Sequence, residues 1–149
     1  MRVLRVGCWV LAGATALAGC KATDTSATPW EIVHGTSTIA AAKAVDTATY
    51  AQIVAFTGAG GTITVADDSS LTGWFKLAAA DSQDHFTGSV SFGDSARMAL
   101  SGITPWKYRL ITSSAYPNTY GLVSDTVLTA NLVGDAGLEH YRLYWELQR

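Results

Sequence analysis

The chain has 149 residues, of which 48% are hydrophobic, and its formal net charge is −2. That length suits one domain, and a chain of this size buries enough apolar surface to fold without disulfide cross-links. It contains no basic stripe, which argues against nucleic acid as a partner.

The first twenty residues are typical of a bacterial secretory signal that ends in a cysteine. Two arginines give a basic start, an apolar run covers 6–18, and the stretch closes on Leu17-Ala18-Gly19-Cys20. The apolar run is shorter than the about 20 residues that a membrane-spanning helix needs. The closing quartet resembles the lipobox of bacterial lipoproteins, which implies a signal peptide at 1–19, cleavage before Cys20 and lipidation of its sulfur.

Residues 20–29 are expected to form the lipidated cysteine and a flexible tether, because they are small and polar and lack apolar periodicity. Residues 21–29 reach at most about 30 Å when extended, so the domain at 30–149 would sit close to the bilayer. The membrane is then a partner through the N-terminal lipid. The expected location is the bacterial cell envelope. In a cell with two membranes we expect the outer membrane, facing the periplasm, because Lys21 stands where enterobacterial lipoproteins retained at the inner membrane have aspartate.

From Trp30 onward, apolar and polar residues mostly alternate, which is the pattern of half-buried strands. The clearest case is 86–92, where Phe86, Val90 and Phe92 share one face. Further strands are expected over 30–33, 50–56, 62–66, 71–79, 96–100, 106–110, 119–123, 126–133 and 138–147. The regular spacing predicts an all-β fold, namely a single antiparallel up-and-down β-barrel of about 8–10 strands, with a β-sandwich as the alternative. The last strand would pair with the first, at Trp30, and close the barrel.

Residues 39–45 depart from this pattern because they are rich in alanine and follow Thr36-Ser37-Thr38. Hydroxyl residues favour helix N-caps and alanine favours helix interiors, so one short helix is expected here.

The chain resembles the small lipocalin-like, calycin-type lipoproteins of bacteria in three segments. These are the opening Trp30-Glu31-Ile32-Val33, the stretch at 127–133 with the Gly-Asp-Ala-Gly turn after it, and the aromatic ending at 141–149. The resemblance implies a barrel in which Trp30 packs across the floor near Arg149 or Arg142.

Residues with catalytic or metal-binding potential are few and scattered. The histidines His34, His85 and His140 share no metal-ligand spacing, and no Gly-x-Ser-x-Gly elbow occurs. The sequence therefore predicts no catalytic residues, no metal site and no cofactor, and the chain is not expected to be an enzyme.

A set of aromatic residues shares the inward parity of its strands, and the sequence leaves its role open between a packed core and a ring-lined cavity. The candidate ligand-binding residues are Phe75, Phe92, Trp106, Tyr108, Tyr141 and Trp145. The first hypothesis is an envelope lipoprotein whose barrel binds a small apolar or amphiphilic ligand. The alternative is a structural or interaction lipoprotein with a filled core that contacts other envelope proteins. A cavity of about 300 Å³ or more would favour the first. Trp74 has outward parity and is the candidate partner surface.

Overall fold

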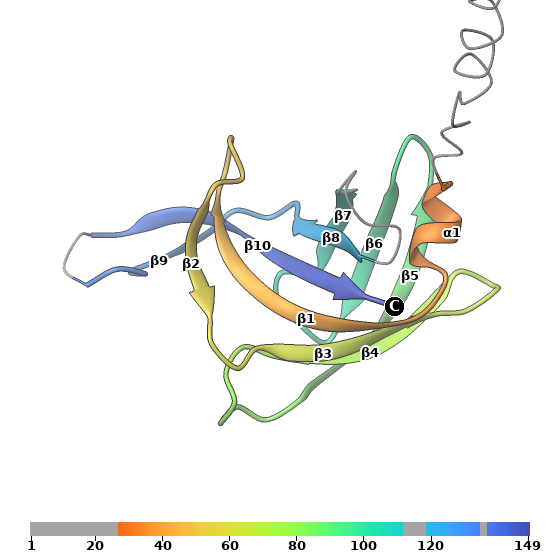
Figure 1. Cartoon of the computed structure of the whole chain (residues 1–149), viewed down its shortest axis with the longest axis horizontal. Coiled ribbons are helices and arrows are strands. Elements are labelled where there is room, and N and C mark those ends of the chain that lie inside the picture. Colours follow the sequence, from red (N-terminus) through yellow and green to blue (C-terminus); the bar gives the residue numbers. More distant parts are fainter. Residues whose placement is uncertain (1–26, 112–118, 135–136) are drawn as a thin grey trace, which may run out of the picture.

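One antiparallel sheet of ten strands curls until β1 meets β10, which closes it into a barrel (Figure 1). The computed structural model describes residues 27–111, 119–134 and 137–149, so the signal segment, Cys20 and most of the tether lie outside the described residues. The elements are α1 (Pro29–Val33), β1 (Gly35–Asp46), β2 (Gln52–Phe56), β3 (Gly60–Val65), β4 (Ser70–Lys76), β5 (Asp84–Phe92), β6 (Ala96–Ser101), β7 (Lys107–Ile111), β8 (Thr119–Ser124), β9 (Leu128–Ala130) and β10 (Glu139–Gln148). The prediction of a single antiparallel barrel is confirmed.

The ring itself contains eight strands, in the order β1-β3-β4-β5-β6-β7-β8-β10 and back to β1. Among the residues that the structure describes, β2 pairs only with the second half of β1, and β9 only with β10, so both lie outside the ring. Closure therefore follows the predicted route, with the last long strand against the first. The first strand, however, is Gly35–Asp46 and not the segment at Trp30.

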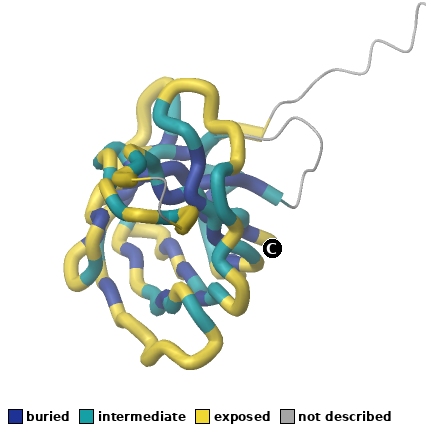
Figure 2. Tube along the Cα trace, turned by 90° about the vertical axis from the view of Figure 1, so that its left-hand side faces the viewer, coloured by how far each residue is buried: buried dark blue, intermediate teal, exposed yellow. Residues whose placement is uncertain are grey.

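Alternation along the strands separates the core from the surface. In β6, Ala96, Met98 and Leu100 are buried while the residues between them are exposed. Figure 2 shows the same alternation of buried and exposed segments along the strands, with exposed residues gathered at the connections. The apolar residues thus share one interior, as the two-residue period predicted.

Glycines allow the sheet to bend sharply around this interior. Gly73 on β4 lies opposite Phe86, and a Cβ there would overlap the Phe86 ring and the carbonyl oxygen of Thr62. Gly88 on β5 lies opposite Leu100, and a Cβ there would overlap the backbone of Ala99. Because glycine has no side chain, neighbouring strands can approach closely at these positions, as tight curvature of the sheet requires.

Residues 30–33 were predicted as a strand but form α1 instead. Thr28 caps this helix: its side chain accepts a hydrogen bond from the Glu31 amide, and the Glu31 carboxylate accepts one from the Thr28 amide. Pro29 occupies the first turn, where its fixed φ suits a helix and its missing N–H costs nothing. The capping box therefore stabilises a helix in this segment, although its residues also favour a strand.

Residues 39–45 were predicted as a helix but belong to strand β1. Ala42 lies directly opposite Trp145 on β10, and Ala42 and Ala44 are buried. The small alanine side chain leaves room for the indole next to it. Helix propensity is weak compared with pairing to neighbours on both edges, so the tertiary context decides.

α1 packs over one end of the barrel, through buried Val33 and partly buried Trp30 and Ile32. The Trp30 indole stacks on the His34 ring with centroids 4.5 Å apart, and Arg149 donates to the His34 carbonyl at 2.6 Å. Trp30 and Arg149 thus lie at the same end, whereas Arg142 donates to the Ser124 carbonyl at 2.9 Å. Within the described residues, no helix is long and apolar enough to cross a membrane.

Candidate functional site

Aromatic rings occupy the middle of the barrel. Trp145 has no exposed surface, and the Tyr108 ring stacks on it with centroids 4.3 Å apart. The Phe75 ring packs on the same indole at 4.7 Å, and that of Phe86 lies at 6.1 Å. Phe75, Tyr108 and Trp145 therefore do point inward, as predicted, but they pack on one another. The space that the ligand hypothesis placed between them is filled by the rings themselves.

Phe92 and Trp106 were predicted to line the interior with this set, but neither is buried in the ring cluster. Phe92 is 40% exposed at the end of β5, where its ring meets the edge of Trp30 at 5.2 Å. Trp106 precedes β7 and is 50% exposed. Parity holds only within a strand, and each of these residues lies at or beyond a strand end, where the chain leaves the barrel wall.

Two polar atoms are buried in the ring cluster. Among the described residues, neither the Tyr108 hydroxyl nor the Trp145 indole N–H has a hydrogen-bond partner. Burial raises the pKa of Tyr108 well above its ordinary value, because the phenolate would lose its hydration there. Both residues therefore act in the core through their rings, at some cost in unsatisfied polar groups.

A small hollow opens at the end of the barrel opposite α1, and we call it the mouth. It has a volume of about 220 Å³, below the roughly 300–1,000 Å³ typical of small-molecule sites. Its lining combines apolar side chains with two carboxylates, and includes Phe56, Phe75, Asp81, Asp84, Leu128, Tyr141 and Leu143. Tyr141, predicted as a ligand-binding residue, thus reaches this hollow and not the ring cluster. The Asp81 carboxylate is engaged in the adjacent turn, where it accepts from the Ala78 amide at 2.9 Å.

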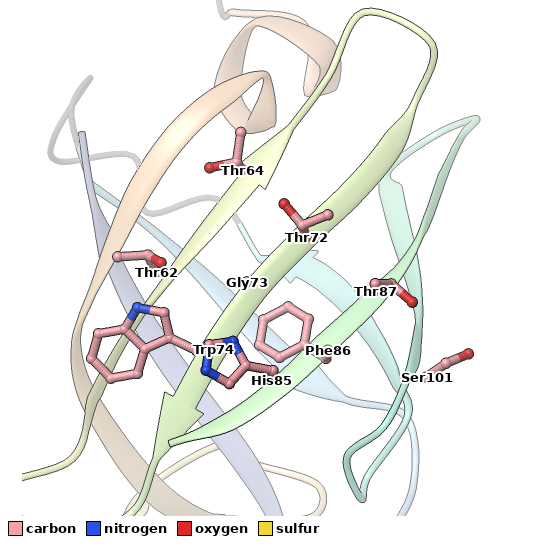
Figure 3. Close-up of a pocket in the computed structure, with 9 residues that line it drawn as sticks. All are labelled: Thr62, Thr64, Thr72, Gly73, Trp74, His85, Phe86, Thr87 and Ser101. Atoms are coloured by element: carbon pink, nitrogen blue, oxygen red, sulfur yellow. The ribbon is translucent and has the colours of Figure 1, made fainter. Parts of the chain in front are cut away.

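A larger hollow lies on the outer surface of the barrel, over β3, β4 and β5, and contains Trp74. Its volume is about 460 Å³, and it is open to solvent. Trp74 pairs across the strands with Thr62 on one side and His85 on the other. Figure 3 shows the indole and the imidazole next to each other at one end of this surface. The outward parity predicted for Trp74 is therefore correct.

Hydroxyl side chains form a continuous row beside this tryptophan. The strand registers place Thr36, Thr64, Thr72, Thr87 and Ser101 opposite one another across five adjacent strands, β1, β3, β4, β5 and β6. All five are exposed, and the Thr36 and Thr64 hydroxyls are 2.9 Å apart in a hydrogen bond. In Figure 3 the last four follow one another across the strands. We call this row, together with Thr62, Trp74 and His85, the hydroxyl face.

The hydroxyl face carries few charges. The residues that line its hollow are threonines, one serine, Trp74, His85, Gly73 and Phe86, with no carboxylate, lysine or arginine. Nor does any group of three or more His, Cys, Asp or Glu side chains lie together within the described parts of the chain. What this surface offers chemically is neutral hydrogen-bonding groups beside one indole ring.

Sequence reasoning singled out Trp74 but missed the hydroxyl row. Alternation in the segment 86–92 predicts that Thr87 points outward, opposite to Phe86, and the structure shows the same pattern for Thr64 and Thr72 in their strands. Their alignment depends on the pairing registers between β1, β3, β4, β5 and β6, which the alternation within one strand does not specify. In the sequence, the row was indicated only by threonines at outward positions of several predicted strands.

Comparisons of this chain with protein-family models, with curated proteins and with solved structures find no match.

Proposed function

We propose that this chain is a lipid-anchored binding protein of the bacterial envelope, and that it binds its partner through the hydroxyl face around Trp74. One observation carries the proposal: three of the predicted ligand-binding rings, those of Phe75, Tyr108 and Trp145, pack on one another in the interior, while a hollow of about 460 Å³ opens outside at Trp74. Partly buried aromatic residues surrounded by polar groups are common at binding surfaces. Of the two hypotheses from the sequence, this one extends the filled-core alternative.

The anchor in this proposal is the lipid on Cys20, supported by the Leu17-Ala18-Gly19-Cys20 motif. Each buried methylene of an acyl chain contributes about 0.8 kcal/mol to membrane binding, so several chains hold the protein firmly. The short tether keeps the barrel near the bilayer, which limits its partners to components of the envelope. In a cell with two membranes, these are molecules that reach the periplasmic face of the outer membrane.

Site-directed photo-crosslinking in living cells tests the proposed face. A photoreactive residue replaces Thr87, which is exposed on the hydroxyl face, and a matched one replaces Thr129, which is exposed on β9 outside the ring. We expect a crosslinked envelope component from position 87 that disappears when Trp74→Ala is added, and none from position 129. Equal crosslinking at both positions, or none at 87, would contradict the proposal.

The mouth supports a second candidate function, the binding of a small apolar or amphiphilic ligand. Phe75, Tyr141 and Leu143 give its wall ring and aliphatic surface, and Asp81 and Asp84 place carboxylates in its lining. Burying apolar area there would contribute about 25 cal/mol per Å², less the cost of association. Its small volume limits the ligand to one or a few apolar groups, which is why this candidate ranks second.

A further inference from the structure

We infer that the hydroxyl face binds a neutral glycan chain, an inference that rests on the proposed function and specifies the ligand of the same surface. The chemistry of the face selects the ligand. Hydroxyl groups both donate and accept hydrogen bonds, so a row of them fits a partner whose own groups also do both. Sugar hydroxyls and N-acetyl groups meet that requirement at every ring.

The aromatic residue fits the same ligand. Trp74 is partly exposed between Thr62 and His85, so the indole sits within the polar surface and not beside an apolar patch. A tryptophan ring offers a flat apolar surface with an N–H at its edge. The C–H face of a pyranose packs on such a ring while the hydroxyls at its rim reach the neighbouring Thr62 and His85.

The absence of formal charge from the lining of this hollow argues against other occupants. Nucleic acid and anionic polymers require lysine or arginine to neutralise their charges, and the lining contains neither. A protein interface of useful affinity usually has several apolar or aromatic anchors at its centre. Here the residues that line the hollow with Trp74 are threonines, one serine, His85, Gly73 and Phe86.

The shape of the face favours a chain over a single sugar. Neighbouring strands are about 4.8 Å apart, so a row across five strands from Thr36 to Ser101 extends for roughly 19 Å. A single ring would contact only a small part of that row. A glycan chain that follows the curve of the wall would meet hydroxyls on successive strands, with one of its rings stacked on Trp74.

Isothermal titration calorimetry on the full chain, purified in detergent, tests the inference. The probes are three neutral hexasaccharides (chitohexaose, cellohexaose and maltohexaose) and one charged polymer, polygalacturonate. We expect at least one neutral hexasaccharide to bind and polygalacturonate not to bind. Trp74→Ala should weaken binding at least about tenfold, because stacking and apolar burial are lost together.

Two further variants make the test specific. The double variant Thr72→Val/Thr87→Val keeps strand-forming side chains and removes two hydroxyls, and each loss should weaken binding roughly two- to tenfold. Trp106→Ala is the matched control, because Trp106 is also exposed but lies outside the face. Its affinity should stay within about twofold of that of the unmodified chain, and circular dichroism melting confirms that each variant is folded.

The outcomes separate this inference from the proposed function. Equal weakening by Trp74→Ala and Trp106→Ala, or binding of the charged polymer as tightly as the neutral ones, overturns the glycan assignment. If no hexasaccharide binds while position 87 still crosslinks a protein in a Trp74-dependent way, the glycan assignment falls and the binding face stands. If neither binding nor crosslinking occurs, both fall.

Discussion

Replacing Trp145 by alanine is expected to be among the most destabilising single substitutions in the barrel. The indole has no exposed surface and contacts the rings of Tyr108 and Phe75. An aromatic side chain buries about 150–250 Å², which at about 25 cal/mol per Å² corresponds to roughly 4–6 kcal/mol. Measured losses for such truncations are about 3–5 kcal/mol, a large share of a typical stability of about 5–15 kcal/mol.

Glu146→Ala is the matched control one residue further along β10. The Glu146 carboxylate is half-buried on the opposite face and lies 3.4 Å from the Lys43 ammonium. Ion pairs of this kind contribute about 0–1 kcal/mol, so the control should cost little. Trp145→Phe gives an intermediate step that folds if the alanine variant does not, because it keeps one ring in the core.

Urea denaturation followed by far-UV circular dichroism measures the free energy of unfolding without relying on the altered tryptophan. A loss of at least about 3 kcal/mol for Trp145→Ala, against less than about 1 kcal/mol for Glu146→Ala, is expected. Equal losses would refute the reasoning. A shift of one residue in the pairing of β10 exchanges its two faces, so equal losses would mean that the register with β1 and β8 is wrong.

Three further predictions follow from the anchor, the core and the mouth. Cys20→Ala should abolish palmitate labelling and release or mis-sort the protein; labelling that persists would exclude lipidation at this residue. Tyr108→Phe should leave the free energy of unfolding at pH 7 unchanged or raise it by up to about 1 kcal/mol, because the hydroxyl is buried without a partner among the described residues. Because burial raises the pKa of Tyr108 in the fold, the unfolded chain ionises first as the pH rises above about 10, and this ionisation favours unfolding, so the variant should show a shallower alkaline decline in urea titrations. If the mouth binds an apolar probe, Tyr141→Ala should weaken the fluorescence titration while Trp106→Leu leaves it unchanged; the reverse order would place the site elsewhere.

Most strands could be predicted from the sequence because alternation is a local property. The strand expected over 86–92 appears as β5 (Asp84–Phe92), and the one expected over 96–100 appears as β6 (Ala96–Ser101). The two errors at the start of the domain have different causes. The helix at Pro29–Val33 had a recognisable signal in its Thr28-x-x-Glu31 capping box, which a preference for strands obscured. The strand at 39–45 had none, since alanine favours a helix until neighbours on both edges outweigh it.

For the candidate site too, features that depend on one strand could be predicted, and features that depend on several strands could not. Outward parity of Trp74 and inward parity of Trp145 are local, and both predictions hold. Whether inward rings line a cavity or fill it depends on the barrel's diameter and on which ring meets which, and neither is encoded in one strand. An eight-stranded barrel is just wide enough for its side chains to fill, so six inward rings were more than it could hold. Phe92 and Trp106 lie at the strand ends, outside that interior.

The two tryptophans Trp145 and Trp74 should therefore separate stability from binding. Trp145 fills the interior, and replacing it creates a cavity whose cost falls on folding. Trp74 lies on the outer face beside threonines, which favour strands by themselves, so Trp74→Ala should change the free energy of unfolding by no more than about 0.5 kcal/mol. Unfolding and ligand binding are measured on both variants. If the binding site is on the outer surface of the barrel, Trp145→Ala lowers the free energy of unfolding, and Trp74→Ala lowers the affinity for the ligand. A stable Trp74→Ala variant with unchanged binding would instead favour the mouth as the binding site.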